Sequence, residues 1–249
     1  MILMYHNVAE CAGFNTVAVS SIEEQLSWVA DRTAVVTLAE YTAAIETGGA
    51  SDNRVAFTVD DAYSSFSTHV LPVCERKNIP VAVFVPVDHV GCWNVWDGSI
   101  TGERFEIVSW EALAEIARHP LVTVGSHGLS HSRLSLLDES DVRREMAESK
   151  QSIENHLGVP VEFFSYPYGQ TTDFTKKTVV SARESGYRAA CSTRFGRTNR
   201  RDDLYRLFRV EIEPVDTMDS FRRKCTSRLH PKLLRRYVKE SLHACGLYG

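Results

Sequence analysis

Short apolar segments alternate with helix-like segments along most of the chain, and this alternation constrains the fold more than any other feature. Apolar stretches that suit strands occur at residues 2–5, 55–59, 81–85, 121–124, 163–166, 187–191 and 207–212. Segments with apolar residues at helical spacing occur at residues 20–29, 38–45, 70–76, 109–118, 138–157 and 173–185. Strands that alternate with helices, without an internal sequence repeat, predict an α/β protein built from parallel β/α units. Such units form either a barrel or a doubly wound sheet.

Composition and cysteine usage limit the class of protein further. The 249 residues, 43% of them hydrophobic, suit one large domain, and the net charge of −4 gives no reason to expect a nucleic-acid partner. The six cysteines are scattered without a Cys-x-x-Cys pair, which favours a reducing compartment, the cytoplasm. The first residues lack the charged and apolar regions of a secretion signal. No apolar run approaches the roughly 20 residues that would span a bilayer.

Polar residues follow several of the predicted strands directly. In α/β folds, chemistry gathers where parallel strands end and loops begin. Polar groups after four different strands favour a barrel over an open sheet. These groups are His6, the Asp60-Asp61 pair, the pair His127 and His131, and the segment Pro167-Tyr168-Gly169.

The Asp60-Asp61 pair ends the apolar strand at residues 55–59. Neighbouring side chains on a regular strand point to opposite faces, so the two carboxylates can act together only where the strand breaks into a loop. Two adjacent like charges also repel, and a cation or a hydrogen-bond donor must offset that cost. A plain turn is the alternative interpretation, because Asp is common in turns.

His127 and His131 are four residues apart in a segment where Gly125 and Gly128 permit a tight loop. Two imidazoles and one carboxylate make a three-ligand set with an open position, the arrangement that catalytic zinc sites use. Asp61 is the natural third ligand, which leaves Asp60 free to act as a base. The alternative is that the two histidines line an exposed helix face.

Three segments, in this order, resemble the signature of the polysaccharide deacetylase family, also called the NodB-homology family or carbohydrate esterase family 4. They are Thr-Val-Asp-Asp at residues 58–61, Ser-His-Gly-Leu-Ser-His at 126–131 and Tyr-Pro-Tyr-Gly at 166–169. The resemblance covers roughly residues 1–215. It implies a distorted (β/α) barrel that removes acetyl groups from N-acetylated sugars with a divalent metal, most often zinc, with cobalt and nickel as alternatives.

The resemblance also implies roles for individual residues. Asp61, His127 and His131 would bind the metal, and Asp60 would be the general base. The backbone N–H of Tyr168 would help to stabilise the oxyanion.

Two features depart from the family pattern. The family takes its general acid from a late Leu-x-x-His motif, which is missing here. An early Tyr-His after a strand resembles the permuted poly-N-acetylglucosamine deacetylases, so we assign the general acid to His6. The alternative is that the His6 ring only forms a hydrogen bond to a backbone carbonyl. The family's arginine before Pro-Tyr-Gly is Ser165 here, and we expect Arg209 to replace it.

Aromatic residues near these motifs are candidates for binding the sugar. Trp93 and Trp96, in a long loop at residues 88–105, would form a stacking wall, unless they belong to the core. Tyr63 and Pro167 complete the predicted substrate-binding set.

The end of the chain differs from the rest. From residue 222 onward there are eight Lys or Arg against one acid, with leucines at helical spacing. We expect residues 1–218 to form the barrel and residues 219–249 a basic helical extension. Its leucines would pack on the barrel, or the helix would lie on an anionic membrane surface, or it would contact an acidic glycan or lipid-linked substrate.

The sequence therefore predicts a metal-dependent deacetylase that acts on an N-acetylated sugar in a glycan, a glycolipid or a nucleotide-linked precursor. Without an export signal, we expect an intracellular substrate. The alternatives are a carbohydrate-binding barrel without catalysis and an amide or ester hydrolase for small acetylated compounds. No feature of the sequence predicts the oligomeric state.

Overall fold

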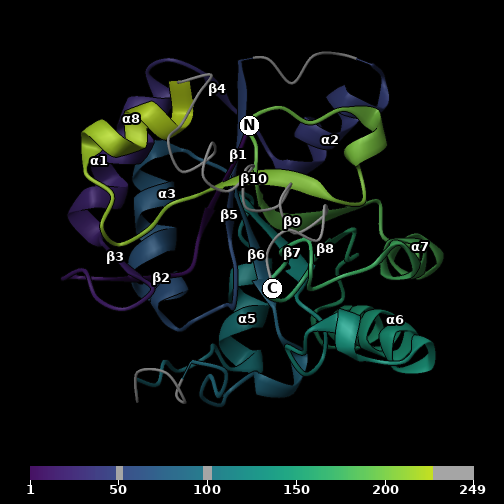
Figure 1. The fold of residues 1–249 in the computed structure, drawn as a ribbon. Helices are drawn as coiled ribbons and strands as arrows, with labels where there is room; N and C mark the ends of the chain where they lie inside the picture. Colours follow the sequence, from purple (N-terminus) through teal and green to yellow (C-terminus); the bar gives the residue numbers. More distant parts are fainter. Residues whose placement is uncertain (49–52, 98–102, 227–249) are drawn as a thin grey trace, which may run out of the picture.

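The computed structural model describes residues 1–48, 53–97 and 103–226, and its central feature is a closed ring of parallel strands (Figure 1). The ring runs in the order β1-β10-β9-β8-β7-β6-β5, and β5 pairs with β1 to close it. The short strand β4 pairs with the beginning of β5 outside the ring, and β2 and β3 form a separate pair. This closure confirms the α/β barrel that the sequence predicts.

The strands are short and most are buried. They are β1 (Ile2–Tyr5), β2 (Asn7–Ala9), β3 (Thr16–Ala18), β4 (Ala34–Val35), β5 (Arg54–Val59), β6 (Val81–Val85), β7 (Val122–Ser126), β8 (Phe163–Ser165), β9 (Ala189–Phe195) and β10 (Leu207–Glu211).

The helices lie between consecutive strands and after the last one. They are α1 (Val19–Ala30), α2 (Leu38–Glu46), α3 (Leu71–Lys77), α5 (Trp110–Ala117), α6 (Glu139–Leu157), α7 (Lys176–Glu184) and α8 (Met218–Thr226). A π-helical turn at Phe66–Val70 leads into α3, and 3₁₀ turns occur at Val87–His89, Leu134–Leu136 and Arg201–Asp203.

Successive side chains of the strands point alternately into and out of the barrel, and this divides the core into two layers. One set of strand residues, such as Leu3, Phe57 and Val83, packs with the surrounding helices in the larger apolar cluster. The alternate residues, among them Ile2 and Ala56, form a second cluster with three residues of α2. Because successive side chains of a strand point to opposite faces, the second cluster fills the barrel interior.

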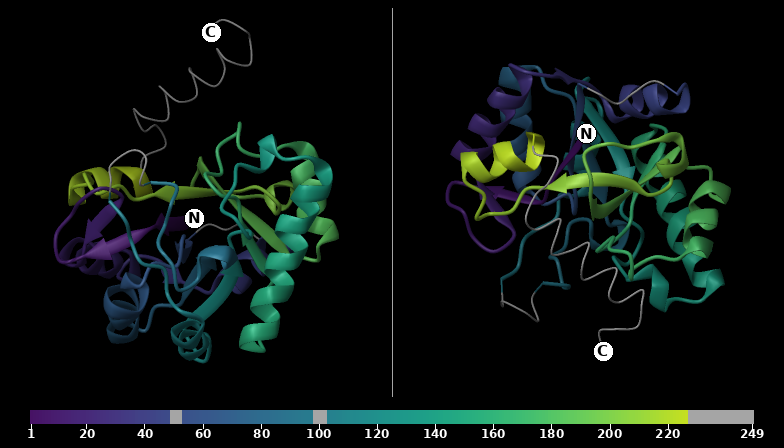
Figure 2. Two further views of the ribbon diagram at one scale, coloured as in Figure 1. Left: turned by 90° about the horizontal axis from the view of Figure 1, so that it is seen from below. Right: turned by 45° about the horizontal axis from the view of Figure 1, so that its top comes forward.

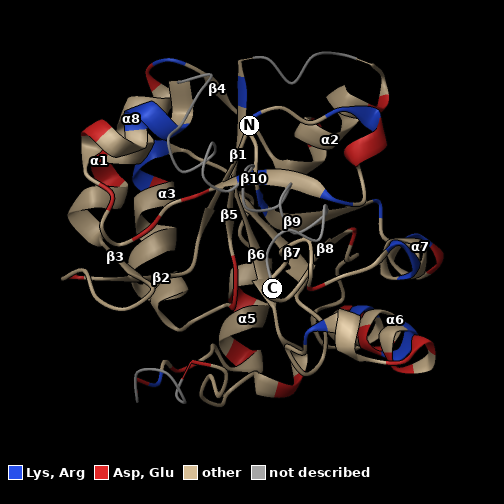
Figure 3. Cartoon of the chain, viewed as in Figure 1, with Lys and Arg blue, Asp and Glu red and all other residues tan. Residues whose placement is uncertain are grey.

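The helices surround this barrel. Figure 1 shows α1, α3 and α8 on one side and α6 and α7 on the opposite side. Charged residues lie mainly on these outer helices and the loops, with both signs on α6 (Figure 3). Asp138 caps the N-terminus of α6, and Gly158, in a left-handed conformation, ends it.

Some element bounds differ from the sequence-based expectation. The strand expected at residues 187–191 is β9, Ala189–Phe195, and the strand expected at 121–124 is β7, which continues to Ser126. The strands β2, β3 and β4 were not expected, because two or three residues are too few for a periodic pattern.

The basic extension expected from residue 219 begins inside α8, and both views of Figure 2 place α8 beside α1. Phe221 is fully buried and contacts Trp28 edge to face, with 5.8 Å between ring centroids. Lys224 is 4% exposed and donates hydrogen bonds to Glu213 and Asp216. The first part of the expected extension is therefore packed on the barrel, and residues 227–249 lie outside the described residues. Among the described helices, none is long and apolar enough to cross a membrane.

Candidate metal and catalytic site

A cavity of about 260 Å³ opens where several strands of the barrel end. Its lining comes from the loops after β1, β5, β7 and β8, from the loop between β2 and β3, from β9 and β10, and from the segment between β6 and α5. The residues that line it are His6, Phe14, Asn15, Asp60, Asp61, Trp96, Asp97, His127, His131, Tyr168, Gln170, Thr193 and Glu211. The cavity thus gathers the polar residues that follow separate strands in the sequence.

The backbone after β5 separates the two adjacent carboxylates. Asp60 continues the inward face of Ala56 and Thr58, so its side chain enters the barrel interior. Asp61 and Ala62 then adopt left-handed conformations, with φ of 71° and 49°. A non-glycine residue in this region costs about 1–3 kcal/mol, and such strain concentrates at functional sites. The turn directs the Asp61 carboxylate away from Asp60 and toward the loop after β7.

Asp61, His127 and His131 form one compact group of buried side chains. Oδ1 of Asp61 lies 3.3 Å from Nε2 of His127 and 3.2 Å from Nε2 of His131. The three ligand atoms all lie within 4.8 Å of one another. Tetrahedral ligands bound at about 2.0–2.1 Å from a zinc ion are about 3.3 Å apart. The two measured distances match that spacing.

The surroundings of the two histidines orient their Nε2 atoms. Nδ1 of His127 lies 2.7 Å from the carbonyl oxygen of Ser165, and this contact makes Nδ1–H the donor and leaves Nε2 free to bind a metal. The His131 ring stacks on Trp96, with 3.8 Å between ring centroids and 19° between planes. Neither Oδ1 of Asp61 nor Nδ1 of His131, both buried, has a hydrogen-bond partner among the described residues.

These residues therefore fit a divalent metal. Two neutral imidazoles and a carboxylate are ordinary zinc ligands, and a buried acceptor without a hydrogen-bond donor needs a cation to offset its desolvation.

Burial and charge act together on the acid–base behaviour of this group. Burial alone would raise the pKa of Asp61, but the two imidazoles outweigh it and hold the pKa well below its usual range. Burial lowers the pKa of His131, and the neutral form is the one that binds metals. Burial also acts to lower the pKa of His127, but the nearby carboxylates of Asp61 and Asp60 raise it.

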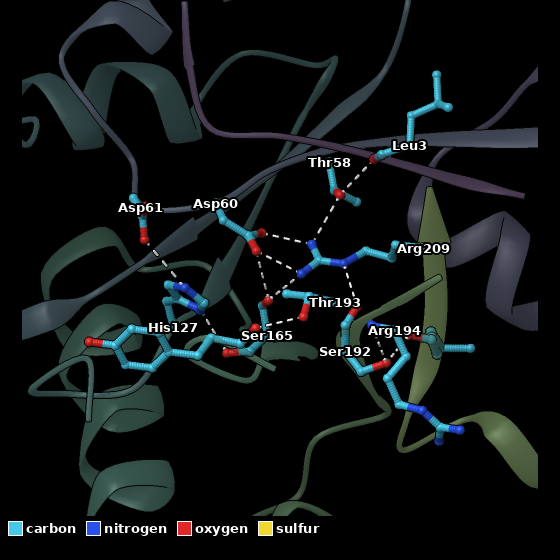
Figure 4. Close-up of polar contacts among 12 residues, drawn as sticks. Leu3, Thr58, Asp60, Asp61, His127, Ser165, Ser192, Thr193, Arg194 and Arg209 are labelled. Atoms are coloured by element: carbon cyan, nitrogen blue, oxygen red, sulfur yellow. Dashed lines mark hydrogen bonds and ion pairs between the residues drawn. The ribbon is translucent and has the colours of Figure 1, made fainter. Parts of the chain in front are cut away.

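Asp60 is held by Arg209 inside the barrel (Figure 4). Nη1 of Arg209 donates to Oδ1 at 2.7 Å, and Nη2 donates to Oδ2 at 2.6 Å. Burial would raise the pKa of Asp60, but the charge and the hydrogen bonds of Arg209 lower it below its usual value. The Ser165 hydroxyl adds a third donor, at 3.2 Å from Oδ2. Asp60 is therefore an ionised carboxylate beside the Asp61–His127–His131 group.

Arg209 reaches Asp60 through the barrel interior, past the intervening strand β1. It is fully buried and comes from β10, which is not a neighbour of β5 in the ring. Its remaining donors bind the backbone oxygen of Ser192 at 2.9 Å and the hydroxyl groups of Thr58 at 3.2 Å and Ser165 at 2.9 Å. The serine in the place of the family's arginine thus contacts both Asp60 and Arg209.

His6 and Tyr168 also line the cavity. His6 lies between β1 and β2, and Tyr168, in the loop after β8, has a left-handed φ of 59°. The centroids of the Tyr168 and His131 rings are 5.1 Å apart. The Arg133 guanidinium lies over the Tyr168 ring, with its Cζ atom 3.9 Å from the ring centroid. The turn is tight, because the Gly169 N–H donates to the Pro167 carbonyl at 2.6 Å.

The predicted substrate-binding residues divide into two groups. Trp96 lines the cavity, whereas Trp93 is 52% exposed and does not. Tyr63 is 1% exposed and Pro167 is buried, and neither is among the residues that line the cavity.

Asp97 is a site residue that the sequence reasoning missed. It lines the cavity, accepts hydrogen bonds from Asn94 at 3.0 Å and Tyr63 at 3.4 Å, and has a pKa raised by burial and by Asp61. Its position directly after Trp96 in the sequence is the only signal that could have indicated it.

Comparison with known proteins gives consistent matches. The model of the family described as polysaccharide deacetylase matches residues 47–190. The poly-beta-1,6-N-acetyl-D-glucosamine N-deacetylase of Escherichia coli (strain K12) is 31% identical over 137 residues, which cover 50% of this chain and 20% of that protein. The chain thus matches about one fifth of the length of this curated relative.

Solved structures show the same fold over nearly the whole chain. The structure of IcaB from Ammonifex degensii has a TM-score of 0.75 and 25% identity, and the match covers 90% of this chain and 94% of that one. The deacetylase PplD of Streptococcus pyogenes, in complex with acetate, has a TM-score of 0.74 and 17% identity, covering 90% and 97% of the two chains.

Proposed function

The chain belongs to the polysaccharide deacetylase family, and on this basis we propose that it is a metal-dependent hydrolase that removes the N-acetyl group from an N-acetylated sugar of a glycan. One observation carries the proposal. Three buried ligand atoms converge at one point, and an ionised carboxylate, Asp60, lies next to them in the same cavity.

Asp61, His127 and His131 would hold the metal, and their donor set suits zinc, with cobalt and nickel as alternatives. A divalent ion held by these residues would supply Lewis acidity toward an acyl carbonyl and would lower the pKa of a bound water to about 7.

Asp60 is the proposed general base. Among the described residues, its Oδ2 accepts from Arg209 and from Ser165, while Oδ1 accepts from Arg209 alone. Each carboxylate oxygen has about two acceptor positions, so Oδ1 retains one for the proton of the attacking water. Arg209 keeps Asp60 ionised and fixes its orientation through the two parallel hydrogen bonds.

Two further residues of the cavity would stabilise the oxyanion and protonate the leaving group. The Tyr168 backbone N–H, in the tight turn before Gly169, would donate to the oxyanion of the tetrahedral intermediate. His6 would protonate the departing sugar amine, because expulsion of an unprotonated amide anion is prohibitive. Trp96 would offer an apolar face to the acetyl group or to the sugar ring.

The relatives suggest the sugar. The Escherichia coli protein is named for poly-β-1,6-N-acetylglucosamine, and we propose a polymer or oligomer of N-acetylglucosamine as the substrate. The alternative of a barrel without catalysis rests on two departures from the family pattern, the missing arginine next to Pro-Tyr-Gly and the missing late histidine. The Arg209–Asp60 pair supports a replacement for the arginine, and the position of His6 in the cavity supports a replacement for the histidine. Cytoplasmic location and membrane contact through residues 227–249 remain predictions.

The test measures metal content and acetate release with purified protein. We expect one zinc, cobalt or nickel ion per chain, and acetate release from β-1,6-linked N-acetylglucosamine oligomers in preference to small acetylated amines. Asp60→Asn should bind the metal normally and lose about 10²–10⁴-fold in turnover, whereas Asp31→Asn, at an exposed position, should keep full activity. Full turnover by Asp60→Asn would show that the assigned base is wrong.

A further inference from the structure

Helix α6 carries a buried acid that has no cationic partner in the part of the chain that the structure describes. Glu145 is 3% exposed, and no Lys or Arg among the described residues forms an ion pair with it. An isolated buried carboxylate is costly unless hydrogen bonds satisfy it. Its neighbours on the same face of α6, Val142 and Met146, belong to the apolar core. A charge at this place in the helix therefore needs a specific explanation.

The hydrogen bonds of Glu145 all go to the loop that connects His127 with His131. Its Oε2 accepts from the backbone N–H of Leu129 at 2.7 Å and of Ser130 at 3.1 Å. Its Oε1 accepts from the Ser130 hydroxyl at 2.5 Å. One carboxylate thus binds both consecutive amides that lie in the middle of the loop between the two histidines.

The same helix also anchors the beginning of the loop. Ser149, one turn after Glu145 on α6, accepts a hydrogen bond from the Ser126 hydroxyl at 2.7 Å. The Ser126 oxygen in turn accepts from the Gly128 N–H at 3.1 Å. On the opposite side, the loop carbonyls of Gly128 and Leu129 accept from backbone amides of residues 87 and 88. The loop is therefore held on both sides, with Glu145 binding its amide donors.

The loop needs this support because its backbone is not in a relaxed conformation. His131 has a φ of 56°, a left-handed conformation that costs a non-glycine residue about 1–3 kcal/mol. Only a surrounding structure that holds the residue keeps it there. If the loop relaxed, the His131 ring would leave the position in which it faces Asp61 and stacks on Trp96.

We propose that Glu145 is a positioning residue of the metal site, which sets the distance between His127 and His131 by binding the amides of Leu129 and Ser130. The proposal rests on the metal site described under the proposed function. Glu145 does not touch the cavity that holds the ligand atoms, so it acts through the loop and not as a ligand.

Two conservative substitutions separate hydrogen bonding from charge. In Glu145→Gln the amide oxygen can accept from both backbone N–H groups, and the NH₂ group can donate to the Ser130 hydroxyl. That hydroxyl can then direct its own proton to Ser132, 2.7 Å away. Glu145→Asp keeps the charge but shortens the side chain by one methylene, and its carboxylate no longer reaches the loop. If the hydrogen bonds matter, Gln substitutes well and Asp poorly.

The measurement is the affinity of the metal-free protein for Zn²⁺ and Co²⁺, determined by competition with a chelator, together with the visible absorption spectrum of the Co²⁺ form. Loss of an outer partner of a metal ligand typically costs 10–100-fold in affinity. We expect a loss in this range for Glu145→Ala and Glu145→Asp, with a changed cobalt spectrum, and a change below about threefold for Glu145→Gln. Glu148→Ala, at an exposed acid of the same helix, is the matched control and should bind like the wild type.

Wild-type metal affinity in Glu145→Ala would overturn the proposal. Normal metal binding in Glu145→Asp together with weak binding in Glu145→Gln would also overturn it, because the metal site would then depend on the charge at position 145 and not on the hydrogen bonds to the loop. If Glu145→Ala fails to fold, the Gln and Asp variants still decide. A wild-type protein that binds neither ion would overturn the metal site itself, a result distinct from a failure of the positioning role.

Discussion

Replacing Arg209 with methionine should reveal how the barrel keeps Asp60 ionised. Methionine fills much of the arginine's volume without charge or donors. Of the donors that the described residues offer to the Asp60 carboxylate, which is 1% exposed, the Ser165 hydroxyl then remains. Removing one partner of a buried ion pair typically costs about 3–5 kcal/mol of stability. Protonation of Asp60 limits that cost, because without Arg209 burial raises the pKa of Asp60 above its usual range.

The pH dependence of stability should therefore change sign. In the wild type the folded pKa of Asp60 is lowered, so its stabilising contribution is present above the unfolded pKa of about 3.9 and is lost as the pH falls through the folded value. In Arg209→Met the folded pKa is raised. The folded state then binds the extra proton, and stability falls as the pH rises from about 4 through the new value. The variant's deficit is thus largest at alkaline pH.

Urea unfolding of the metal-free protein at pH 5, 7 and 8.5 measures this effect. We expect a deficit near the full 3–5 kcal/mol at pH 8.5 and a smaller one at pH 5. The acidic limb of kcat/KM should move to higher pH for the same reason, because the base must be ionised to act. Asp60→Asn/Arg209→Met should recover most of the stability, since it removes the unpaired charge.

The control is Arg206→Met, at a half-exposed arginine whose ion pair with Asp203 spans 3.9 Å, and it should change stability by less than about 0.5 kcal/mol. If Arg209→Met unfolds with the wild-type dependence on pH and keeps the acidic limb in place, then Arg209 does not control the ionisation of Asp60 and the assignment is refuted.

Three further outcomes follow from the packing. Lys224→Met removes the cation between two carboxylates and should cost about 3 kcal/mol in thermal unfolding, a loss that an unchanged melting temperature would contradict. Gly169→Ala should lower kcat more than tenfold with metal affinity kept, because φ is +66° and the new Cβ would lie 2.8 Å from a backbone nitrogen; wild-type acetate release would argue against a strict turn. Trp96→Ala should weaken Co²⁺ binding about tenfold by freeing the His131 ring, whereas Trp93→Ala, at a 52% exposed position, should leave the titration unchanged.

Local sequence patterns predicted the parallel β/α units and the metal-binding and acid–base candidates of the cavity, and the family resemblance implied the barrel. The strands are short apolar runs bounded by helices, and the closure of parallel strands places all their carboxyl ends together. Residues that directly follow strands, such as Asp61 after β5 and His127 after β7, were therefore found from the sequence. The shortest strands escaped detection, since two or three residues carry no periodicity.

Contacts that cross the barrel or join a helix to a loop were harder to predict. Glu145 belongs to a helix rich in charges, and only its spacing from Val142 and Met146 marks it as part of the buried face. Trp93 and Trp96 look equivalent in the sequence, but one is exposed and the other stacks on His131, because their loop forms a bridge between Trp93 and Glu106. In an irregular segment the backbone has no periodicity, so the sequence spacing of two side chains does not determine whether they point in the same direction.

The turn after β5 explains how two adjacent carboxylates acquire different chemistry. Had the strand continued regularly, Asp61 would point outward into the helix layer, like Val59, and no ligand set could form. The left-handed pair at residues 61 and 62 instead directs Asp61 to the two imidazoles, while Asp60 stays on the inward face with Arg209. Each carboxylate thereby meets its own partners, Arg209 for Asp60 and the two imidazoles for Asp61, so that both can be ionised at the same pH. The backbone strain at this turn is the cost of placing a base beside a metal ligand with no residue between them.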